Sequence, residues 1–372
     1  MKLFLVIWLS LLGGMNGYVL WKLRVLLPGP PAAVWTVVAL GWAWGVAGFP
    51  LVWFAGRELP ETVFRYLLLA CVWWLALAFW MLFLFAGADL WNLLAGWRWP
   101  DWRLAARPMA FAVLGLAALA ALAGSVLARR PVLRTLEIRT ARLPAGTAPI
   151  RVVFLSDCHY GMTTPAGQEK RIRDLVLAAK PDLLLGGGDF IDICDGHARE
   201  CLNRLAEIPS PLGRFGVLGN HEMYAGAAGS ERLLRDGLQM TILRGQSADV
   251  GDHLRIVGVD DPGHHNRPST ASPRPDNLPG HDPGRFTILL KHQPVIGPGT
   301  AGTIDLQLSG HTHGGQIFPF NWLVRLQYPH PDGHLVETQG VRLYVSRGAG
   351  TWGPPLRLFH PGEVTLVILK PE

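Results

Sequence analysis

Two histidines, His311 and His313, stand one residue apart in the segment Gly310-His-Thr-His-Gly-Gly-Gln316. In an extended segment residues i and i+2 point to the same side, so both imidazoles can face one pocket. Glycines on both flanks allow the backbone to turn tightly and to approach whatever the rings hold. The pattern predicts a metal site, with a glycine-rich surface turn as the alternative for an isolated motif.

Further residues of the types that bind metals follow predicted strands elsewhere in the chain. They are Asp157, His159, Asp189, Asn220 and His292, with His221 next to Asn220. In α/β sheets ligands bind at the carboxyl ends of strands, so we expect these groups to converge on one rim. Each residue alone has a structural explanation, such as a turn cap or a buried histidine. Five coincidences at five strand ends favour a shared site.

The types of donor restrict the chemistry. Carboxylate, imidazole and amide oxygen without thiolate suit Mn, Fe, Zn or Co and not a closed structural zinc site. Seven candidate ligands exceed what one ion needs, whereas two ions about 3.5 to 4 Å apart, bridged by one carboxylate, would use them all. Such a pair generates a bridging hydroxide near neutral pH and stabilises the attacking and leaving oxygens at phosphorus. The residues therefore predict hydrolysis of a phosphoester or phosphoanhydride.

Strands and helices alternate in the part of the chain that carries these residues. Strands are predicted at 150–155, 182–185, 215–218, 254–259, 286–290, 304–308, 341–345 and 364–369, because each range is a short β-branched or aliphatic run that ends near a turn residue. Helical periodicity is found at 167–180, 200–208 and 231–238. The long segment 261–284, which includes His264 and His265, has no periodicity and predicts a surface insertion. The order indicates an α/β layered domain.

The first third of the chain is predicted to cross a membrane. Thirteen of the 15 tryptophans lie at or before Trp102, whereas all 13 histidines lie at or after His159. Apolar runs occupy 3–21, 32–55, 66–94 and 109–128, and each is near or above the roughly 20 residues that span a bilayer. We predict four transmembrane helices within residues 1–130 and a catalytic domain over residues 131–372.

Two features of the apolar runs leave alternatives open. The first run could be a cleaved signal peptide, although no small-residue cleavage site follows it. Asp89 lies near the end of the third run, where it either lines a substrate path or reaches water at the interface.

The distribution of charge bears on partners and orientation. Up to Arg130 ten basic residues stand against four acidic ones, whereas 24 of each balance from Pro131 onward. The polar part has no basic runs, which argues against nucleic acid as a partner. Four spans place the N-terminus and the polar part on one face, where basic residues are in slight excess. This predicts a multi-pass protein of the inner membrane with a cytoplasmic catalytic domain.

The motifs taken together resemble those of the calcineurin-like metallophosphoesterase superfamily. The resemblance covers nearly all of residues 150–370 and includes Asp157-x-His159, Gly188-Asp189, Gly219-Asn-His-Glu222, Lys291-His292 and Gly310-His-Thr-His313. The long Gly-His-Thr-His-Gly-Gly-Gln form and the tail at 346–355 are most similar to membrane-associated bacterial phosphodiesterases of the YaeI and YkuE kind.

The resemblance implies a fold and a role for each residue. The fold would be a four-layer α/β/β/α sandwich with the metals at the sheet ends. His221 would act beside the leaving group, as a general acid or a charge stabiliser, and Asp192 would orient His221 or a ligand, or else cap the next helix. The ligands of the two divalent ions would be Asp157, His159 and His313 for the first, Asn220, His292 and His311 for the second, and Asp189 as the bridge.

Two features narrow the substrate. Protein phosphatases of the superfamily carry a phosphate-binding arginine directly after the aspartate that corresponds to Asp192, but here Ile193 follows it. Arg347 could replace that arginine, because a guanidinium binds phosphate in bidentate fashion, or it could be a surface ion-pair partner. The apolar segment 317–324 could enter lipid beside the site or pack on the membrane helices.

These features favour a membrane-anchored phosphodiesterase or pyrophosphatase whose substrate is a lipid-linked or nucleotide-lipid phosphoester. The alternatives are a membrane signalling or binding protein whose phosphoesterase-like domain senses a phosphorylated ligand, and a phosphoprotein phosphatase. Because every metal position is filled, the sequence argues against a degenerate domain that only binds.

Overall fold

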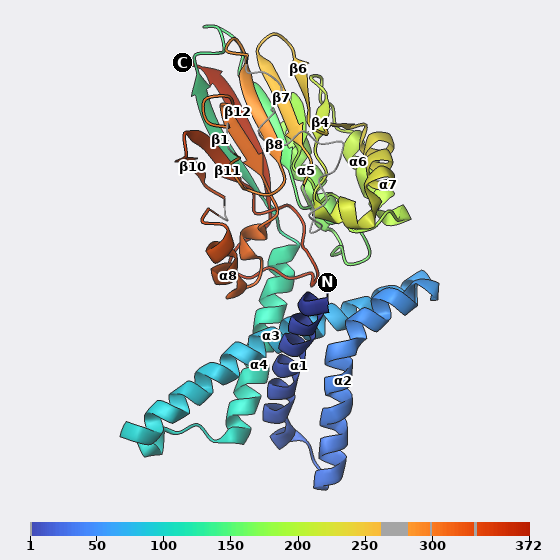
Figure 1. Cartoon of the computed structure of the whole chain (residues 1–372), viewed down its shortest axis with the longest axis vertical. Helices are drawn as coiled ribbons and strands as arrows, with labels where there is room; N and C mark the ends of the chain where they lie inside the picture. The colour runs from blue at the N-terminus through green and yellow to red at the C-terminus, as the bar shows by residue number, and fades with distance from the viewer. Residues whose placement is uncertain (1, 262–281, 298–299, 331–332) are drawn as a thin grey trace. The chain divides into compact units, whose positions relative to one another are not determined.

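The computed structural model describes residues 2–261, 282–297, 300–330 and 333–372. The chain forms two compact units, Met1–Ala123 and Gly124–Glu372; in Figure 1 the colours run from the blue helices of the first to the red strands of the second. Most of the predicted insertion at 261–284, including His264 and His265, lies outside the described residues.

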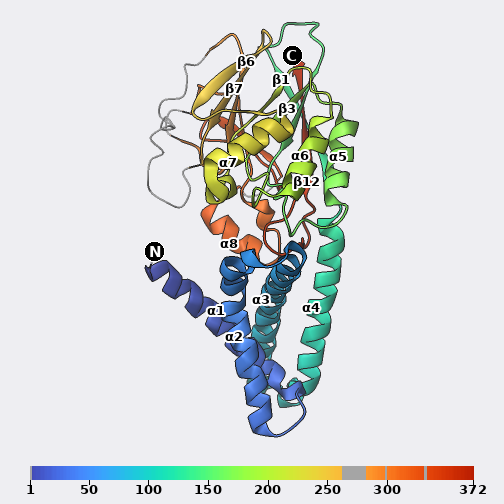
Figure 2. The same ribbon diagram turned by 90° about the vertical axis from the view of Figure 1, so that its right-hand side faces the viewer.

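Long apolar helices make up the N-terminal third of the chain. They are α1 (Lys2–Leu23), α2 (Pro31–Ala55), α3 (Glu61–Arg98) and α4 (Ala106–Ala128), and all four are visible in Figure 2. By length and composition α2, α3 and α4 are able to cross a membrane. Pro31 begins α2, a position where the missing N–H of proline is not needed. A fourth span, formed by α1, stays a prediction.

Asp89 of α3 is paired within the helical unit. Its carboxylate contacts the ammonium group of Lys22 and accepts a hydrogen bond of 2.6 Å from the Tyr18 hydroxyl. Both partners belong to α1. A charge in or near a membrane is costly unless it is paired, and these two contacts pair Asp89. They also link α1 to α3, a role that the sequence does not suggest.

The second unit contains two six-stranded sheets in its described part. The first has the order β1-β12-β2-β3-β4-β5, with β1 (Val132–Thr140), β2 (Ile150–Leu155), β3 (Leu183–Gly186), β4 (Arg214–Gly216), β5 (Thr241–Ile242) and β12 (Glu363–Pro371). The second has the order β10-β11-β9-β8-β7-β6, with β6 (Gln246–Val250), β7 (Leu254–Val259), β8 (Phe286–Lys291), β9 (Leu306–Ser309), β10 (Leu335–Thr338) and β11 (Val341–Val345). The helices of this unit are α5 (Gln168–Ala179), α6 (Gly196–Ala206), α7 (Asn220–Leu238) and α8 (Phe320–Gln327).

Parallel pairing brings the carboxyl ends of several strands to one edge of each sheet. In the first sheet β2, β3, β4 and β5 are parallel neighbours, and in the second β7, β8, β9 and β11 are. Because parallel strands end on the same side, the loops after β2, β3 and β4 lie together, as do those after β8 and β9. The predicted ligands are all in these loops.

Two buried apolar clusters hold the layers together. One joins α5, α6 and α7 to the first sheet and includes Ile172 and Val153. The other joins the two sheets and includes Phe154 and Ile288. Val153 and Phe154 are neighbours in β2, and adjacent residues of a strand point to opposite faces, so β2 serves both clusters. The structure thus gives a mixed α/β unit with a helical layer and two sheets, whereas a fourth, helical layer stays a prediction.

Candidate metal centre

The seven predicted metal ligands stand directly after five strands. Asp157 and His159 follow β2, Asp189 follows β3, Asn220 follows β4, His292 follows β8, and His311 and His313 follow β9. All but Asn220 and His292 have a positive φ, between 49° and 71°. Residues other than glycine seldom adopt this left-handed conformation, and such strain concentrates at functional sites.

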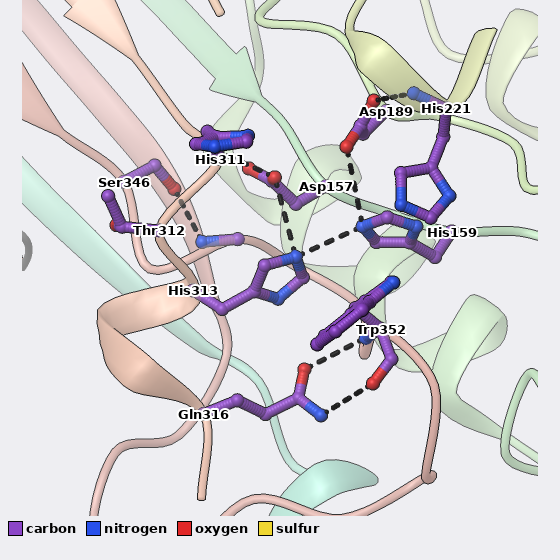
Figure 3. A network of polar contacts seen from close by, with 12 residues as sticks. Asp157, His159, Asp189, His221, His311, Thr312, His313, Gln316, Ser346 and Trp352 are labelled. Atoms are coloured by element: carbon purple, nitrogen blue, oxygen red, sulfur yellow. Dashed lines mark hydrogen bonds and ion pairs between the residues drawn. The ribbon is translucent and has the colours of Figure 1, made fainter. Parts of the chain in front are cut away.

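Asp157, His159 and His313 form a buried cluster. His313 Nε2 lies 3.0 Å from His159 Nε2 and 3.4 Å from Asp157 Oδ1. Figure 3 shows the three side chains pointing toward one another. Bonds of about 2.0–2.1 Å in a tetrahedral arrangement place donor atoms about 3.3 Å apart, so these side chains have the spacing of ligands to one ion.

Asn220, His292 and His311 form a neighbouring cluster. Asn220 Oδ1 lies 2.9 Å from His311 Nδ1 and 3.2 Å from His292 Nε2. The two ring nitrogens are 3.3 Å apart. The spacing again matches that of donor atoms around one ion.

Asp189 lies within reach of both clusters. Its Oδ2 atom is 3.1 Å from His292 Nε2 and 3.8 Å from His159 Nε2, while Oδ1 accepts a hydrogen bond of 2.8 Å from the backbone N–H of His221. A bridging carboxylate requires this position between two ions. Burial disfavours the charged form, but the nearby rings of His292 and His221 hold the pKa of Asp189 well below its usual range.

Asp192 orients two of the imidazoles. Its Oδ1 atom lies 2.6 Å from His159 Nδ1 and 2.8 Å from His221 Nδ1. Burial opposes ionisation, yet these two histidines lower the pKa of Asp192 to about 2. Burial likewise opposes a charged His221, whereas Asp189 and Asp192 raise the pKa of its ring to about 9. The other alternative for Asp192 is wrong, because Asp195 caps the next helix.

The outer contacts of the rings determine which nitrogen faces the centre. The carboxylate of Asp192 accepts from His159 Nδ1, and the carbonyl of Gly187 accepts from His292 Nδ1 at 2.7 Å. An acceptor at Nδ1 places the ring proton there. The Nε2 atoms of His159 and His292 therefore face the centre, as those of ligating imidazoles do.

The donor set fits divalent metal ions. Among the described residues Asp157 Oδ2 is buried without a hydrogen-bond partner, which is uncommon for a buried oxygen unless an ion or water completes it. His292 Nε2 lies within 3.1 to 3.3 Å of Asp189 Oδ2, Asn220 Oδ1 and His311 Nδ1, atoms that a shared cation would bring together. All donors are nitrogen or oxygen, which suits Mn, Fe, Zn or Co.

Glu222 fixes the loops of this centre, although the sequence assigns it no role. Its buried carboxylate accepts four backbone N–H bonds of 2.6 to 3.2 Å, from Asp189, Phe190, Ile191 and Gly219. Burial and the neighbouring Asp189 raise the pKa of Glu222 to about 7. A glutamate three residues after a helix cap is the sequence signal for the bond to Gly219, but the other three bonds join distant segments.

Gln316 holds a second loop beside the centre. Its side-chain amide donates to the carbonyl of Trp352 and accepts from the N–H of the same residue, both at 2.8 Å, as Figure 3 shows. Gln316 is the last residue of the motif that contains His313. The motif therefore positions Trp352 as well as the imidazoles.

Two arginines, Arg347 and Arg357, lie in the loop region after β11. The guanidinium of Arg347 lies beside Gly333 and 4.0 Å from Glu363, and among the described residues none of its hydrogen bonds or ion pairs joins it to a predicted ligand. Arg357, which the sequence does not single out, is fully buried. It donates to the carbonyls of Arg347, Gly348 and Gly350, and thereby holds the loop that runs behind Asp157.

Comparison with known proteins agrees with this geometry. Residues 150–315 match the family described as calcineurin-like phosphoesterase. An uncharacterized metallophosphoesterase of Aquifex aeolicus (strain VF5) is 36% identical over 63% of this chain and 89% of its own length. This chain belongs to the calcineurin-like metallophosphoesterase family. The enzyme is accordingly a metal-dependent phosphoester hydrolase.

Two further relatives differ in how much of their length is matched. The uncharacterized metallophosphoesterase YkuE of Bacillus subtilis (strain 168) is 32% identical over 63% of the enzyme and 83% of its own length. A transmembrane protein with metallophosphoesterase domain from Bos taurus is 31% identical over 72% of the enzyme and 63% of its own length. The enzyme spans about three fifths of the relatives from Campylobacter jejuni and Helicobacter pylori, at 64% and 60%. Two relatives are described as transmembrane proteins, and this chain has helices apolar and long enough to cross a membrane. Together these observations indicate that the enzyme is associated with a membrane.

Proposed function

We propose that the enzyme is anchored in a membrane by residues 1–130, through four spans, and hydrolyses a phosphodiester or pyrophosphate at a two-metal centre in residues 131–372. The observation that carries the proposal is the convergence of seven side chains from five strand ends into two adjoining clusters. Such an arrangement is difficult to explain by fold stability alone, because it concentrates buried charge and backbone strain in one place.

The two clusters would hold one ion each. Asp157, His159 and His313 would bind the first, and the ligands of the second would be Asn220, His292 and His311; Asp189, within 3.8 Å of one ligand in each cluster, would bridge them. Two bound divalent ions would supply a water of lowered pKa and neutralise charge on the phosphate oxygens. Mn, Fe, Zn and Co are the candidates.

The protein's own groups would complete the hydrolysis. One bond forms between the water oxygen and phosphorus while the bond from phosphorus to the leaving oxygen breaks, and the leaving oxygen takes up a proton. His221 stands at the edge of the centre, with its ring 4.6 Å from that of His159 and its side chain part-exposed. Asp192 holds its Nδ1, which leaves Nε2 to face the leaving group as an acid or as a hydrogen-bond donor.

A lipid-linked or nucleotide-lipid phosphoester is the substrate class we favour. The apolar helices keep the enzyme near a bilayer, and no arginine occupies the phosphate-binding position that protein phosphatases use after Asp192. Arg347 stays a proposed phosphate contact. A phosphoprotein phosphatase, or a sensor that binds a phosphorylated ligand without cleaving it, is the second candidate.

Hydrolysis of a soluble reporter tests the chemistry. The full chain in lipid nanodiscs should cleave bis(p-nitrophenyl) phosphate, lose this activity in EDTA and regain it with Mn²⁺. Asp189→Ala should lower kcat by at least about 10³-fold, because an electrostatic stabiliser of the transition state is lost. Asp174→Ala is the matched control, since the side chain of that aspartate is 40% exposed and, among the described residues, its ion pair is with Lys170. Wild-type protein that binds the diester without cleaving it would favour the sensor.

We further propose that the enzyme belongs to the inner membrane and that its catalytic domain faces the cytoplasm. Support comes from the slight excess of basic residues on that face of the predicted four-span topology. A C-terminal alkaline phosphatase fusion should be inactive and a C-terminal green fluorescent protein fusion should fluoresce. The reverse pattern would contradict the cytoplasmic orientation.

A further inference from the structure

The short helix α8 exposes apolar side chains that a soluble surface would not carry. Trp322, Leu323 and Leu326 are 60%, 52% and 84% exposed. Phe359, which is 66% exposed, extends the surface, because its ring and that of Trp322 both contact Phe318 at centroid distances of 5.4 and 5.1 Å. We call these five residues the α8 patch.

The patch adjoins the metal centre at both ends of the helix. Before α8, Gly315 packs so closely on Asn321 that a Cβ atom there would collide with it, and Gly315 is two residues after His313. At the end of α8, the ring of Tyr328 lies 5.5 Å from that of His311, in a perpendicular arrangement. The start of the helix therefore packs against Gly315, and the residue after its end contacts His311, so both ends adjoin the motif of residues 310–316.

The loop of residues 352–359, which includes Phe359 of the patch, is also hydrogen-bonded to the motif of the metal centre. Gln316 binds the backbone of Trp352, and its own carbonyl accepts a hydrogen bond of 2.9 Å from Leu358. Trp352 is 49% exposed. Trp352 and Leu358 are therefore both held next to Gln316, three residues from His313.

The strand register shows that α4, a helix able to cross a membrane, enters the catalytic unit at the edge of the first sheet where β2 ends. Val132, the first residue of β1, pairs with Glu363 of β12, and β12 runs antiparallel to β2 with Thr365 opposite Phe154. β1 therefore begins at the edge where β2 ends in Asp157. Only residues 129–131 separate Val132 from the end of α4, and four Cα steps reach at most about 14 Å.

We propose that the α8 patch inserts into the bilayer surface beside the metal centre and receives the acyl chain of a lipid phosphoester. The proposal rests on the two-metal hydrolase function and adds the route by which the substrate arrives. One tryptophan and two phenylalanines whose rings are in contact, together with two exposed leucines of α8, have the composition of an interfacial segment. We choose lipid as the occupant because the short connection from α4, a helix able to cross a membrane, enters the unit at the edge that carries the metal centre.

A spin label measures the surroundings of the patch directly. The full chain in lipid nanodiscs, as Cys194→Ser to remove the exposed cysteine, is labelled at Leu326→Cys or at the control Leu177→Cys, a leucine of α5 that is 48% exposed. Power saturation should give a label at 326 that is accessible to oxygen and shielded from a nickel chelate, and one at 177 with the opposite result. Equal nickel access at both positions overturns the proposal, as does a label at 326 shielded from both reagents, which would indicate packing on protein.

A pair of matched substrates tests acyl-chain recognition. Hexadecyl p-nitrophenyl phosphate and methyl p-nitrophenyl phosphate have the same leaving group, so their kcat/KM ratio isolates the chain. The ratio should exceed about tenfold in the wild type and fall at least fivefold in Trp322→Gln/Leu326→Gln. Leu177→Gln should keep it. A wild-type ratio near one overturns the proposal even if both esters are cleaved, whereas cleavage of neither would refute the hydrolase function and leave the spin-label result to decide the membrane contact.

Discussion

Single side chains position the loops that carry the predicted metal ligands, and Glu222 does so through four backbone hydrogen bonds. Glu222→Ala would leave four buried N–H groups without an acceptor. Each unpaired donor costs about 1–3 kcal/mol, so we expect a loss of at least about 3 kcal/mol in the free energy of unfolding, measured as denaturant or thermal stability of the purified chain. Glu200→Ala, at an exposed residue of α6, should change it by less than about 0.5 kcal/mol. Comparable losses in the two variants would contradict the role of Glu222.

Asp192 is a positioning residue, because it acts through His159 and His221. Asp192→Asn keeps the shape but removes the charge, and loss of such a supporting carboxylate weakens metal binding or activity about 10–100-fold. Titration with Mn²⁺ should show the weaker binding, and saturating metal should restore only part of kcat because His221 also loses its anchor. Asp192→Glu should recover more than Asp192→Asn. If the Asp192→Asn variant kept both its metal affinity and its kcat, the positioning role of Asp192 would be contradicted.

At the scale of elements, the strand-end loops approach one another so closely that glycine is required. A Cβ atom on Gly310, which follows β9, would collide with Asp157 Oδ2 and Ser156 Oγ in the loop after β2. Gly310→Ala should therefore push Asp157 from its position and weaken metal binding about tenfold or more. Gly196→Ala is the control, since no atom lies within 4 Å of its Cβ position. Equal metal affinities for these two variants would show that the loop tolerates the displacement.

The elements that position the site were predictable because strand ends carry strong local signals. β2, β7 and β11 begin and end where the apolar runs do, and the ligand motifs follow them directly. α8 was not predicted as a helix, because its eight residues are fewer than the roughly 11 to 18 over which helical periodicity is recognised. The contacts of Glu222, Gln316 and Arg357 depend on approaches between distant loops, which the pattern of one strand cannot reveal.

At the scale of the whole molecule, metal binding and folding should be linked. Ions that bind only the folded chain stabilise it by about 2.7 kcal/mol per site when present at 100 times Kd. For a unit of this size each kcal/mol shifts Tm by about 2–4 °C. Removal of both ions with EDTA should therefore lower the Tm of the catalytic unit by about 10–20 °C, measured by calorimetry, and Mn²⁺ should restore it. A Tm that is insensitive to chelator would argue that the clusters hold no ion.

Elemental analysis of the purified full chain tests the shared-aspartate centre most directly. After dialysis against Mn²⁺ and removal of free metal, the wild type and Asp174→Ala should each retain about two ions per chain. Asp189→Ala should retain fewer than one, because the residue within reach of both clusters contributes to both sites. A wild-type chain that retains no ion, or an Asp189→Ala chain that still retains two, would contradict a metal pair bridged by Asp189.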